Sequence, residues 1–490
     1  MKRLSIIAIS ALTLFSACKK DYLETRPTNA VASASAFTTT SDALLVLNGI
    51  HRATYNRETQ GDYGQPSMMI YMDMLGEDLV MNAVGNGWYN NEYKWLSHRN
   101  ENSGLVSYAY RFYYGLLVNA NLIIANIDNA SGPQAEKNYI KGNALAYRAF
   151  CHFNLVQLFG KRYDKATAPN NQLGVPLMLT PTVEPQARET VEKIYTQINA
   201  DIDAAIPLLT TARPNRSHFN VNVVRGLKAR VALTQQNWAV AATEAAAARA
   251  GFSLMSNALY LEGFSDGYNS NPEWMWGIDH IDDQSGFFGA FHSYLSCNYN
   301  STNIRTNPKS INRLIYDVLP ATDVRSKCWD KTGSTAAIVP PGGIRRPYMT
   351  QKFRLLGNPS TTSQGDVPYM RAAEMYLIEA EAKARNNDEA GARTALFTLV
   401  SNRNPSYVLS TNTGQALIDE IMLHRRVELW GEGFRFLDLK RLNQPLNRNG
   451  SNHTLALANI FDMPAGDKAW EFLIPRAELN ANPKVVQNPL

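Results

Sequence analysis

EIMLHRRVELWGEGFRFLDLKR, residues 420–441, is the stretch of sequence that decides the fold. Its apolar residues recur every three or four positions, which predicts a helix with one apolar face, interrupted at Gly431 and Gly433. Opposite charges also lie side by side at that spacing, namely Arg425, Arg426, Glu428, Glu432, Arg435 and Asp438. Because every carboxylate has an arginine within reach, its pKa stays low. We interpret these charges as ion pairs that lock helices together, and not as a general acid–base pair.

The pattern RRxELxGEGxRxxDLKR in this stretch resembles the most characteristic C-terminal motif of the SusD/RagB family of outer-membrane nutrient-binding lipoproteins. Four further segments resemble motifs of the family: 37–49, the G-x-P-L run at 174–177, the R-x-AE helix at 371–382 and the chain end at 472–490. Asn143 departs from the family pattern, because glutamate is usual there. These are mostly scaffold motifs, so they imply the fold and say little about the ligand.

The first 18 residues have the pattern of a secretory signal. Lys2 and Arg3 precede a short apolar run, and the small residues Ser16 and Ala17 precede Cys18. The apolar run is too short to span a bilayer. We expect cleavage after residue 17 and a lipid on Cys18, which would anchor the protein without spanning the membrane. An ordinary signal cut is the alternative, because a smaller aliphatic residue is usual in place of Phe15.

The bulk composition fits a globular body with a large core. The formal net charge is +5, and removal of Lys2 and Arg3 leaves +3, too little to predict nucleic-acid binding. Cys151 lies in an apolar helical run, which predicts a buried thiol. Cys297 and Cys328 could pair in an oxidising compartment, and the sequence does not decide this.

The periodicity predicts a mostly α-helical fold with a tether before it. Residues 18–40 are rich in small residues and are expected to form a lipidated tether, and 41–490 a single domain. Helical-repeat units of the tetratricopeptide type are expected near 137–253 and 366–445. Between them, 254–365 reads as a long loop-rich insertion carrying short β elements, such as the run Trp274–Ile278.

The segment from Tyr71 to Trp95 is predicted to be a loop that binds sugar. Its tryptophans and tyrosines can stack on the apolar faces of pyranose rings, while Asp and Asn bind hydroxyl pairs. The resemblance implies that the glycan site draws on this region. The candidate ligand-binding residues are Asp73, Trp88, Tyr89, Asn91 and Trp95. The alternative is that these rings fill the joint between helices.

A second candidate surface lies in the insertion, where aromatic residues occur in a Ser/Asn-rich loop without a clear period. Tyr294 and Tyr299 are the candidate ligand contacts there, with Phe287, Phe288 and Phe291 nearby in the sequence. Packing explains these rings about as well as ligand binding does.

Two motifs that suggest chemistry are rejected. Gly263–Gly267 has the spacing of a nucleophile elbow, but the following residues favour a turn and not the required helix. Asp279, His280, Asp282 and Asp283 have metal-ligand side chains without a second histidine at the right spacing, so solvated charge is expected. Binding of a calcium ion by oxygen ligands is the alternative for these residues. No catalytic residue, metal or cofactor is predicted.

We therefore expect a binding protein and not an enzyme. The resemblance implies a surface-exposed lipoprotein of the outer membrane that captures an oligosaccharide for a SusC-like TonB-dependent transporter. The alternative is a helical-repeat scaffold that binds protein or peptide. A glycoside hydrolase is a third class, but it needs two unpaired carboxylates across a cleft, and the sequence nominates no such pair.

Overall fold

The computed structural model describes residues 36–59, 61–281, 291–334, 339–340, 342–357 and 364–490. The expected signal and lipidation residue Cys18, the tether up to residue 35, and Asp282, Asp283, Phe287 and Phe288 lie outside these residues.

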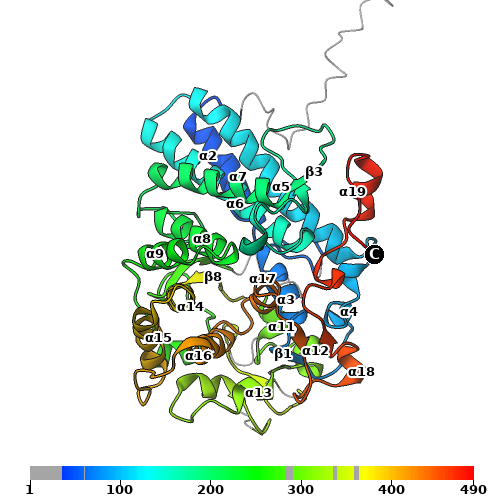
Figure 1. The fold of residues 1–490 in the computed structure, drawn as a ribbon, viewed down its shortest axis with the longest axis vertical. Helices are drawn as coiled ribbons and strands as arrows, with labels where there is room; N and C mark the ends of the chain where they lie inside the picture. The colour runs from blue at the N-terminus through cyan, green and yellow to red at the C-terminus, as the bar shows by residue number, and fades with distance from the viewer. Residues whose placement is uncertain (1–35, 60, 282–290, 335–338, 341, 358–363) are drawn as a thin grey trace, which may run out of the picture.

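Long antiparallel helices form the N-terminal half of the molecule. They are α2 (Thr40–Ala53), α5 (Gly104–Asn126), α6 (Gln134–Phe159) and α7 (Val191–Ala205). Helix α6 packs against both α5 and α7, and α2 covers α5 and α6. The short hairpin of β2 (Leu173–Pro176) and β3 (Arg188–Thr190) joins α6 to α7. Figure 1 shows this layer in blue to green.

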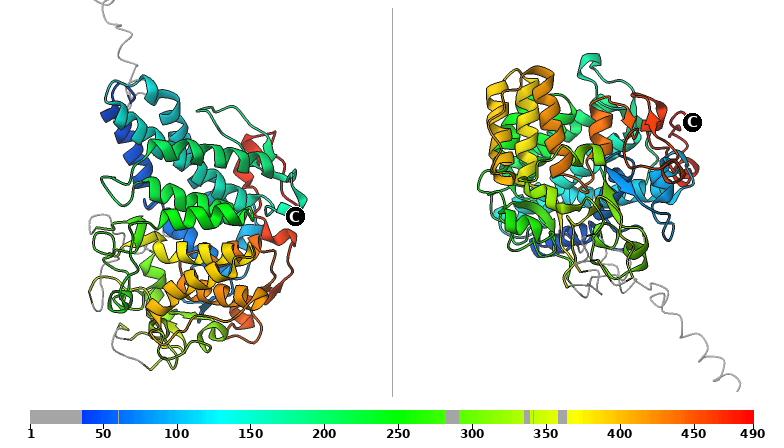
Figure 2. Two further views of the ribbon diagram at one scale, coloured as in Figure 1. Left: turned by 60° about the vertical axis from the view of Figure 1, so that its left-hand side comes forward. Right: turned by 90° about the horizontal axis from the view of Figure 1, so that it is seen from below.

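A second set of helices continues the stack. It contains α8 (Val221–Thr234), α9 (Trp238–Ala248), α14 (Ala372–Arg385), α15 (Glu389–Arg403) and α16 (Gly414–Glu428). Helix α7 contacts α8, and α14 packs against α9, α15 and α16. Figure 2 shows the yellow and orange helices lying next to the green ones. The predicted tetratricopeptide-like helical-repeat scaffold is confirmed.

Local sequence explains where these helices begin and how closely they pack. Thr39 and Asp42 form a capping box at the start of α2: the Thr39 hydroxyl accepts the Asp42 N–H, and the Asp42 carboxylate accepts the Thr39 N–H. Gly226 lets α8 approach the strand before α14, because a Cβ there would lie 2.3 Å from the Met370 sulfur. A side chain at position 226 would therefore push the two segments apart.

The insertion between α9 and α14 contains short elements, as the sequence predicts. Strand β4 (Trp274–Ile278) pairs antiparallel with β8 (Val367–Arg371) at the two ends of the insertion. Four short strands form a sheet in the order β1–β5–β7–β6, which are Leu79–Met81, Lys309–Ile311, Met349–Thr350 and Trp329–Asp330. The helices here are α10 (Asn257–Leu261), α11 (His292–Leu295), α12 (Thr302–Thr306) and α13 (Arg313–Tyr316).

The region from Tyr71 to Trp95 differs from the predicted loop. Its first residues belong to helix α3 (Gln65–Met74), whose burial on all sides hides the amphipathic period. Strand β1 and the single turn α4 (Asn90–Tyr93) follow. The true loop is therefore 82–89, between β1 and α4.

The C-terminal segment runs back over the N-terminal half. After α17 (Arg435–Arg441) come β9 (Leu446–Asn447), α18 (Leu455–Ala458), β10 (Asp462–Met463) and α19 (Arg476–Ala481). The Phe472 N–H donates to the Leu158 carbonyl, which ties this segment to the end of α6. None of the described helices combines the length and the apolar content that crossing a membrane requires.

The three cysteines in the described part of the chain are not linked. Cys151, Cys297 and Cys328 are each buried with a free thiol, so the alternative of a Cys297–Cys328 disulfide does not hold in this structure.

Candidate functional site

Three carboxylates of residues 420–441, those of Glu428, Glu432 and Asp438, lie in the core. Glu428 has no exposed surface, and its carboxylate lies 3.0 Å from Arg371, 3.1 Å from Arg403 and 3.4 Å from Arg325. Burial alone would raise the pKa of Glu428, but these three guanidinium groups hold it well below its usual range. A carboxylate that is always ionised and fully paired is unsuited to proton transfer, so the interpretation as structural ion pairs is confirmed.

The sequence spacing suggests that these charges pair with neighbours on the same helix, but most of their partners lie on other elements. Arg426 pairs with Asp78 at 2.5 Å, in the segment between α3 and β1, and Arg425 reaches Asp438 on α17 at 2.7 Å. Within the stretch, the pair on a single helix is Asp438 with Arg441. The break at Gly431 and Gly433, both with positive φ, turns α17 away from α16, so most pairs join separate elements.

The two loops that the sequence nominates for sugar binding meet in the structure. The ring of Tyr294, on α11, lies 4.9 Å from the ring of Trp88 and 4.5 Å from that of Tyr89. Tyr89 in turn contacts Tyr71 at 5.2 Å. We refer to Tyr71, Trp88, Tyr89 and Tyr294 as the aromatic cluster.

Trp88 is the member of the aromatic cluster that remains half-exposed, whereas Tyr71, Tyr89 and Tyr294 are buried beneath it. Tyr89 adopts a left-handed backbone (φ 61°), which makes a sharp turn between the loop and α4. Asn91, in the first turn of α4, is exposed three residues beyond Trp88. The arrangement thus presents one indole on a rigid aromatic base, with an amide close by in the chain.

Asp73 and Trp95 do not reach this surface. Asp73 is 3% exposed, and its carboxylate accepts the Gly433 N–H at 2.8 Å. Burial raises the pKa of Asp73 well above its ordinary value, although that hydrogen bond lowers it. Trp95 is also 3% exposed, donates its indole N–H to the Leu75 carbonyl and packs on Trp470. Both side chains hold the core together, so neither can contact a ligand in this conformation.

Tyr299 lies apart from the aromatic cluster as well. It is buried in a small separate group with Ile304 and Leu355. Of the seven candidate ligand contacts, the structure therefore brings together Trp88, Tyr89 and Tyr294 and places Asp73, Trp95 and Tyr299 in the interior. Asn91 is exposed, two residues after Tyr89 in the chain.

Sequence reasoning missed the charged groups around the aromatic cluster. Asp62 accepts hydrogen bonds from the hydroxyls of Thr59 and Tyr71, and burial raises its pKa. Burial also raises the pKa of Glu92, which accepts from the Ser97 hydroxyl at 2.7 Å. The segment before α3 has no periodicity or motif that could have nominated Asp62. Glu92 lies within the predicted binding region, but it does not differ in type from many surface carboxylates.

The described residues of the two rejected motifs lie in the following surroundings. Gly263–Gly267 lies between helix α10 and strand β4, the reverse of the strand-to-helix order that a nucleophile elbow requires. His280 bonds to the Tyr63 hydroxyl at 2.6 Å. Among the described residues, no group of three or more His, Cys, Asp or Glu side chains is placed to hold a metal ion.

Two family models match the chain. One, described as the SusD family, matches residues 322–490, and the other, described as starch-binding associating with outer membrane, matches residues 21–233. SusD-like protein P2 of Formosa agariphila is 24% identical over 536 residues, which span all of this chain and 98% of that protein.

Solved structures share the fold over nearly the whole chain. A SusD-like carbohydrate binding protein from Bacteroides vulgatus is 25% identical, with a TM-score of 0.79 over 92% of this chain and 98% of that one. A putative sugar binding protein from the same organism is also 25% identical, with a TM-score of 0.78 over 93% and 99%. A laminarin binding SusD-like protein, 19% identical, has a TM-score of 0.70 over 92% and 100%, a likeness of fold alone.

Proposed function

This chain belongs to the SusD family, and on that basis we propose that it is a glycan-binding protein of the outer membrane that captures an oligosaccharide at the aromatic cluster. The bound oligosaccharide would pass to a SusC-like TonB-dependent transporter. Binding and release, and no chemical step, would be its part in nutrient uptake.

The observation that carries this proposal is the contact between Trp88 and Tyr294. It joins the loop 82–89 and helix α11, more than 200 residues apart in the sequence, into one support for a half-exposed indole. An indole face covers the C–H face of a pyranose ring, and the buried tyrosines beneath it prevent it from turning away. Asn91 and the acceptor groups of Asp62 supply hydrogen-bonding groups of the kind that sugar hydroxyls need.

Localisation rests on the family and on the leader. The model that matches residues 21–233 is described as associating with the outer membrane. A lipid on Cys18 followed by the tether would hold the body at the membrane without a spanning helix. We propose this anchor together with the single globular domain at 41–490.

Two carboxylates near the aromatic cluster raise a second candidate function, that of a glycoside hydrolase. Asp62 and Glu92 both have a raised pKa, which is a property of catalytic acids. Each is held by hydroxyl groups of neighbouring residues, Asp62 by Thr59 and Tyr71, and Glu92 by Ser97. Such tethering suits a fixed hydrogen-bond acceptor, so we favour binding. Release of shorter products by the purified protein alone would favour the hydrolase instead.

The test is a binding screen followed by a matched pair of variants. Purified protein is screened against immobilised oligosaccharides and peptides, and the best glycan is titrated by calorimetry. Trp88→Ala should abolish or strongly reduce this binding. Trp238→Ala makes the same chemical change at a half-buried tryptophan on α9 and should leave the affinity unchanged. Binding of peptides in place of glycans, or equal affinity in both variants, would contradict the proposal.

A further inference from the structure

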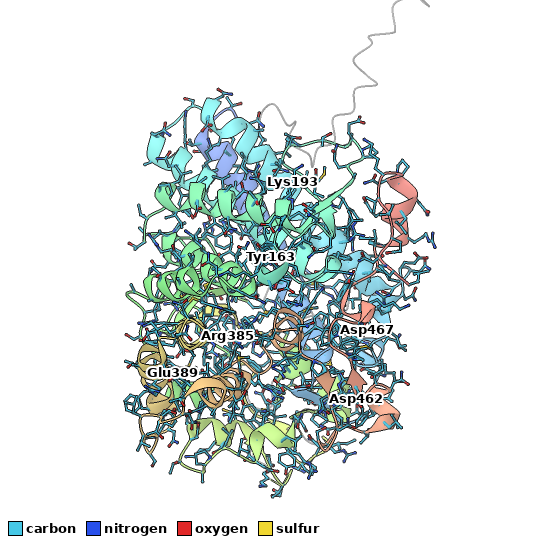
Figure 3. All side chains as sticks on the ribbon, viewed as in Figure 1. Tyr163, Lys193, Arg385, Glu389, Asp462 and Asp467 are labelled. Carbon is cyan, nitrogen blue, oxygen red and sulfur yellow. The ribbon has the colours of Figure 1, made fainter. Side chains whose placement is uncertain are left out.

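A cavity beside the C-terminal segment shares no residue with the aromatic cluster. It has a volume of about 330 Å³ and lies between the loop that follows α6, the end of α17 and the residues around the 3-10 turn Lys468–Trp470. Leu439 and Trp470 form part of its apolar wall. Figure 3 labels Tyr163 and Asp467, which mark two of the chain segments that surround it.

Glu471 is the unusual residue of this cavity. Its side chain is only 6% exposed, and its carboxylate accepts no hydrogen bond from any residue that the structure describes, although the charges of Arg99, Arg188 and Lys440 act on it. Its backbone carbonyl accepts from Arg99 at 2.7 Å, which fixes the chain at this point. The carboxylate therefore has acceptor capacity left for the hydroxyl donors of a ligand in the cavity.

Lys440 cannot serve as that donor. Its ammonium group donates to the carbonyls of Gln157 at 2.6 Å and Gly160 at 2.8 Å, at the C-terminal end of α6. Burial lowers the pKa of Lys440 to about 8, and the charge of Glu471 opposes that shift. The lysine therefore supplies a fixed positive charge to the wall, while its hydrogen bonds are already used by the backbone.

The charged side chains that line the cavity are equally divided between the two signs. Three basic side chains line it, Lys161, Arg162 and Lys440, and three acidic ones, Asp164, Asp467 and Glu471. Arg162 and Asp164 form an ion pair of 2.6 Å with each other. A charged ligand would be attracted by the lining groups of opposite sign and repelled by those of the same sign. The balance therefore favours an uncharged ligand.

The remaining lining groups can both donate and accept hydrogen bonds. The side chains of Thr167, Gln172, Asn443 and Gln444 line the cavity, and all except Gln172 are exposed at its mouth. Amides and hydroxyls of this kind match the alternating donors and acceptors of neighbouring hydroxyl groups. The volume lies at the lower end of the range of small-ligand sites, about 300–1,000 Å³, which suits one or two sugar-sized units.

We propose that this cavity is a second ligand site, which takes an uncharged polyhydroxylated molecule of the size of a monosaccharide or disaccharide. Glu471 accepts hydrogen bonds from its hydroxyl groups, and Gln444 binds it at the mouth. The site works independently of the aromatic cluster.

The experiment uses the full-length Trp88→Ala protein, so that the aromatic cluster does not contribute. Saturation-transfer NMR is recorded with D-glucose, D-galactose, D-mannose, D-xylose, maltose and laminaribiose as neutral probes, and with D-glucuronate and D-glucosamine as charged ones. At least one neutral probe should bind. In the same background, Gln444→Ala and Glu471→Gln should each weaken that binding about tenfold or more. The control Gln415→Ala, at an exposed glutamine on α16, should not change it.

Three results would overturn the proposal. They are no binding of any neutral probe, binding that Gln444→Ala leaves intact, and binding of D-glucuronate or D-glucosamine as strong as that of the best neutral sugar. Gln444 is exposed, so its variant is expected to fold even if Glu471→Gln does not. Because every measurement is made without Trp88, the outcome is separate from the test of the aromatic cluster.

Discussion

Arg371, at the end of β8, and Glu428, at the end of α16, form an ion pair of 3.0 Å in which neither side chain has any exposed surface. Arg403 on α15 and Arg325 in the insertion contact the same carboxylate. The pair therefore fixes the position where the insertion returns to the helical stack.

Loss of this carboxylate should destabilise the fold without a selective effect on binding. Glu428→Ala leaves buried guanidinium groups without their counter-charge, which costs about 3–5 kcal/mol. Arg426→Ala should cost less, because Arg426 is 22% exposed and Arg435 still pairs with Glu77. Urea unfolding gives both values. Lys193→Ala is the control, since its pair with Glu189 is exposed and contributes about 0–1 kcal/mol. Lost binding at unchanged stability would show that the stretch has a direct role in the site.

Asp438 should make the protein sensitive to acid. Burial alone would raise the pKa of Asp438, but Arg425 and Arg441 hold it at about 2, against an ordinary value of 3.8. Its folded-state pKa is depressed, so its contribution to stability is complete above about pH 4 and is lost as the pH falls towards 2. The contribution amounts to about 2 kcal/mol. Melting temperatures measured across this window should fall steeply for the wild type and less steeply for Asp438→Asn. Equal slopes would contradict the prediction.

Asp73 should give the stability of the protein a pH dependence of the opposite sign. Burial raises its folded-state pKa well above the ordinary value, so the folded protein loses stability as the pH rises above that ordinary value. Asp73→Asn keeps an oxygen to accept the Gly433 N–H and removes the charge. The variant should therefore melt at a higher temperature than the wild type at neutral pH, and the difference should shrink in acid. Oligosaccharide affinity should not change. A specific loss of affinity would show that Asp73 takes part in ligand binding.

Stacking should contribute more to sugar affinity than the neighbouring amide does. A fully covered aromatic side chain contributes about 1.5–3 kcal/mol, whereas a neutral hydrogen bond nets about 0.5–1.5 kcal/mol. Trp88→Ala should thus weaken binding more than Asn91→Ala in calorimetric titrations with the same oligosaccharide. Trp95→Ala should instead lower the melting temperature, because Trp95 is buried against Trp470. Similar affinities for wild type and Trp88→Ala would remove the aromatic cluster as the site.

Cys18 should decide where the protein is found. If a lipid is attached there, Cys18→Ala removes the anchor and should move the protein from the membrane fraction to a soluble one. Immunoblots of fractionated cells measure the distribution. The comparison is made in cells that lack the partner transporter, because binding to that transporter could retain the variant. Unchanged membrane association in those cells would contradict the anchor.

Periodicity predicted most of the helical scaffold, because helices such as α16 bury residues at helical spacing, here Leu417, Ile421 and Glu428. It failed for α3, which is buried on every side and so lacks a polar face. The sequence predicted that the charged residues of 420–441 form ion pairs, but it did not predict which residues they pair with. Arg426 binds Asp78, which lies 348 residues away in the sequence, and side-by-side spacing on one helix contains no information about such a contact.

The candidate site was predicted in composition and not in geometry. Trp88 and Trp95 occur in the same aromatic segment, yet one is half-exposed and the other is buried. The difference arises from left-handed backbone at Tyr89 and Trp95 itself, which turns the chain twice within seven residues. Large residues rarely adopt such backbone, so propensity could not anticipate it. The meeting of Trp88 with Tyr294 depends on the path of the whole insertion.

The pairing of β4 with β8, and the contact of α9 with α14, has a consequence for how proteins built on this scaffold could diverge. The insertion leaves and re-enters the helical stack at two neighbouring points, so its length can change without a shift of either helix. Tyr294, a support of the aromatic cluster, belongs to this insertion, whereas Trp88 does not. Replacement of the insertion alone would therefore change the part of the binding surface around Tyr294. The part around Trp88 and the fold would stay the same. Ligand preference can in this way diversify faster than the scaffold that presents it.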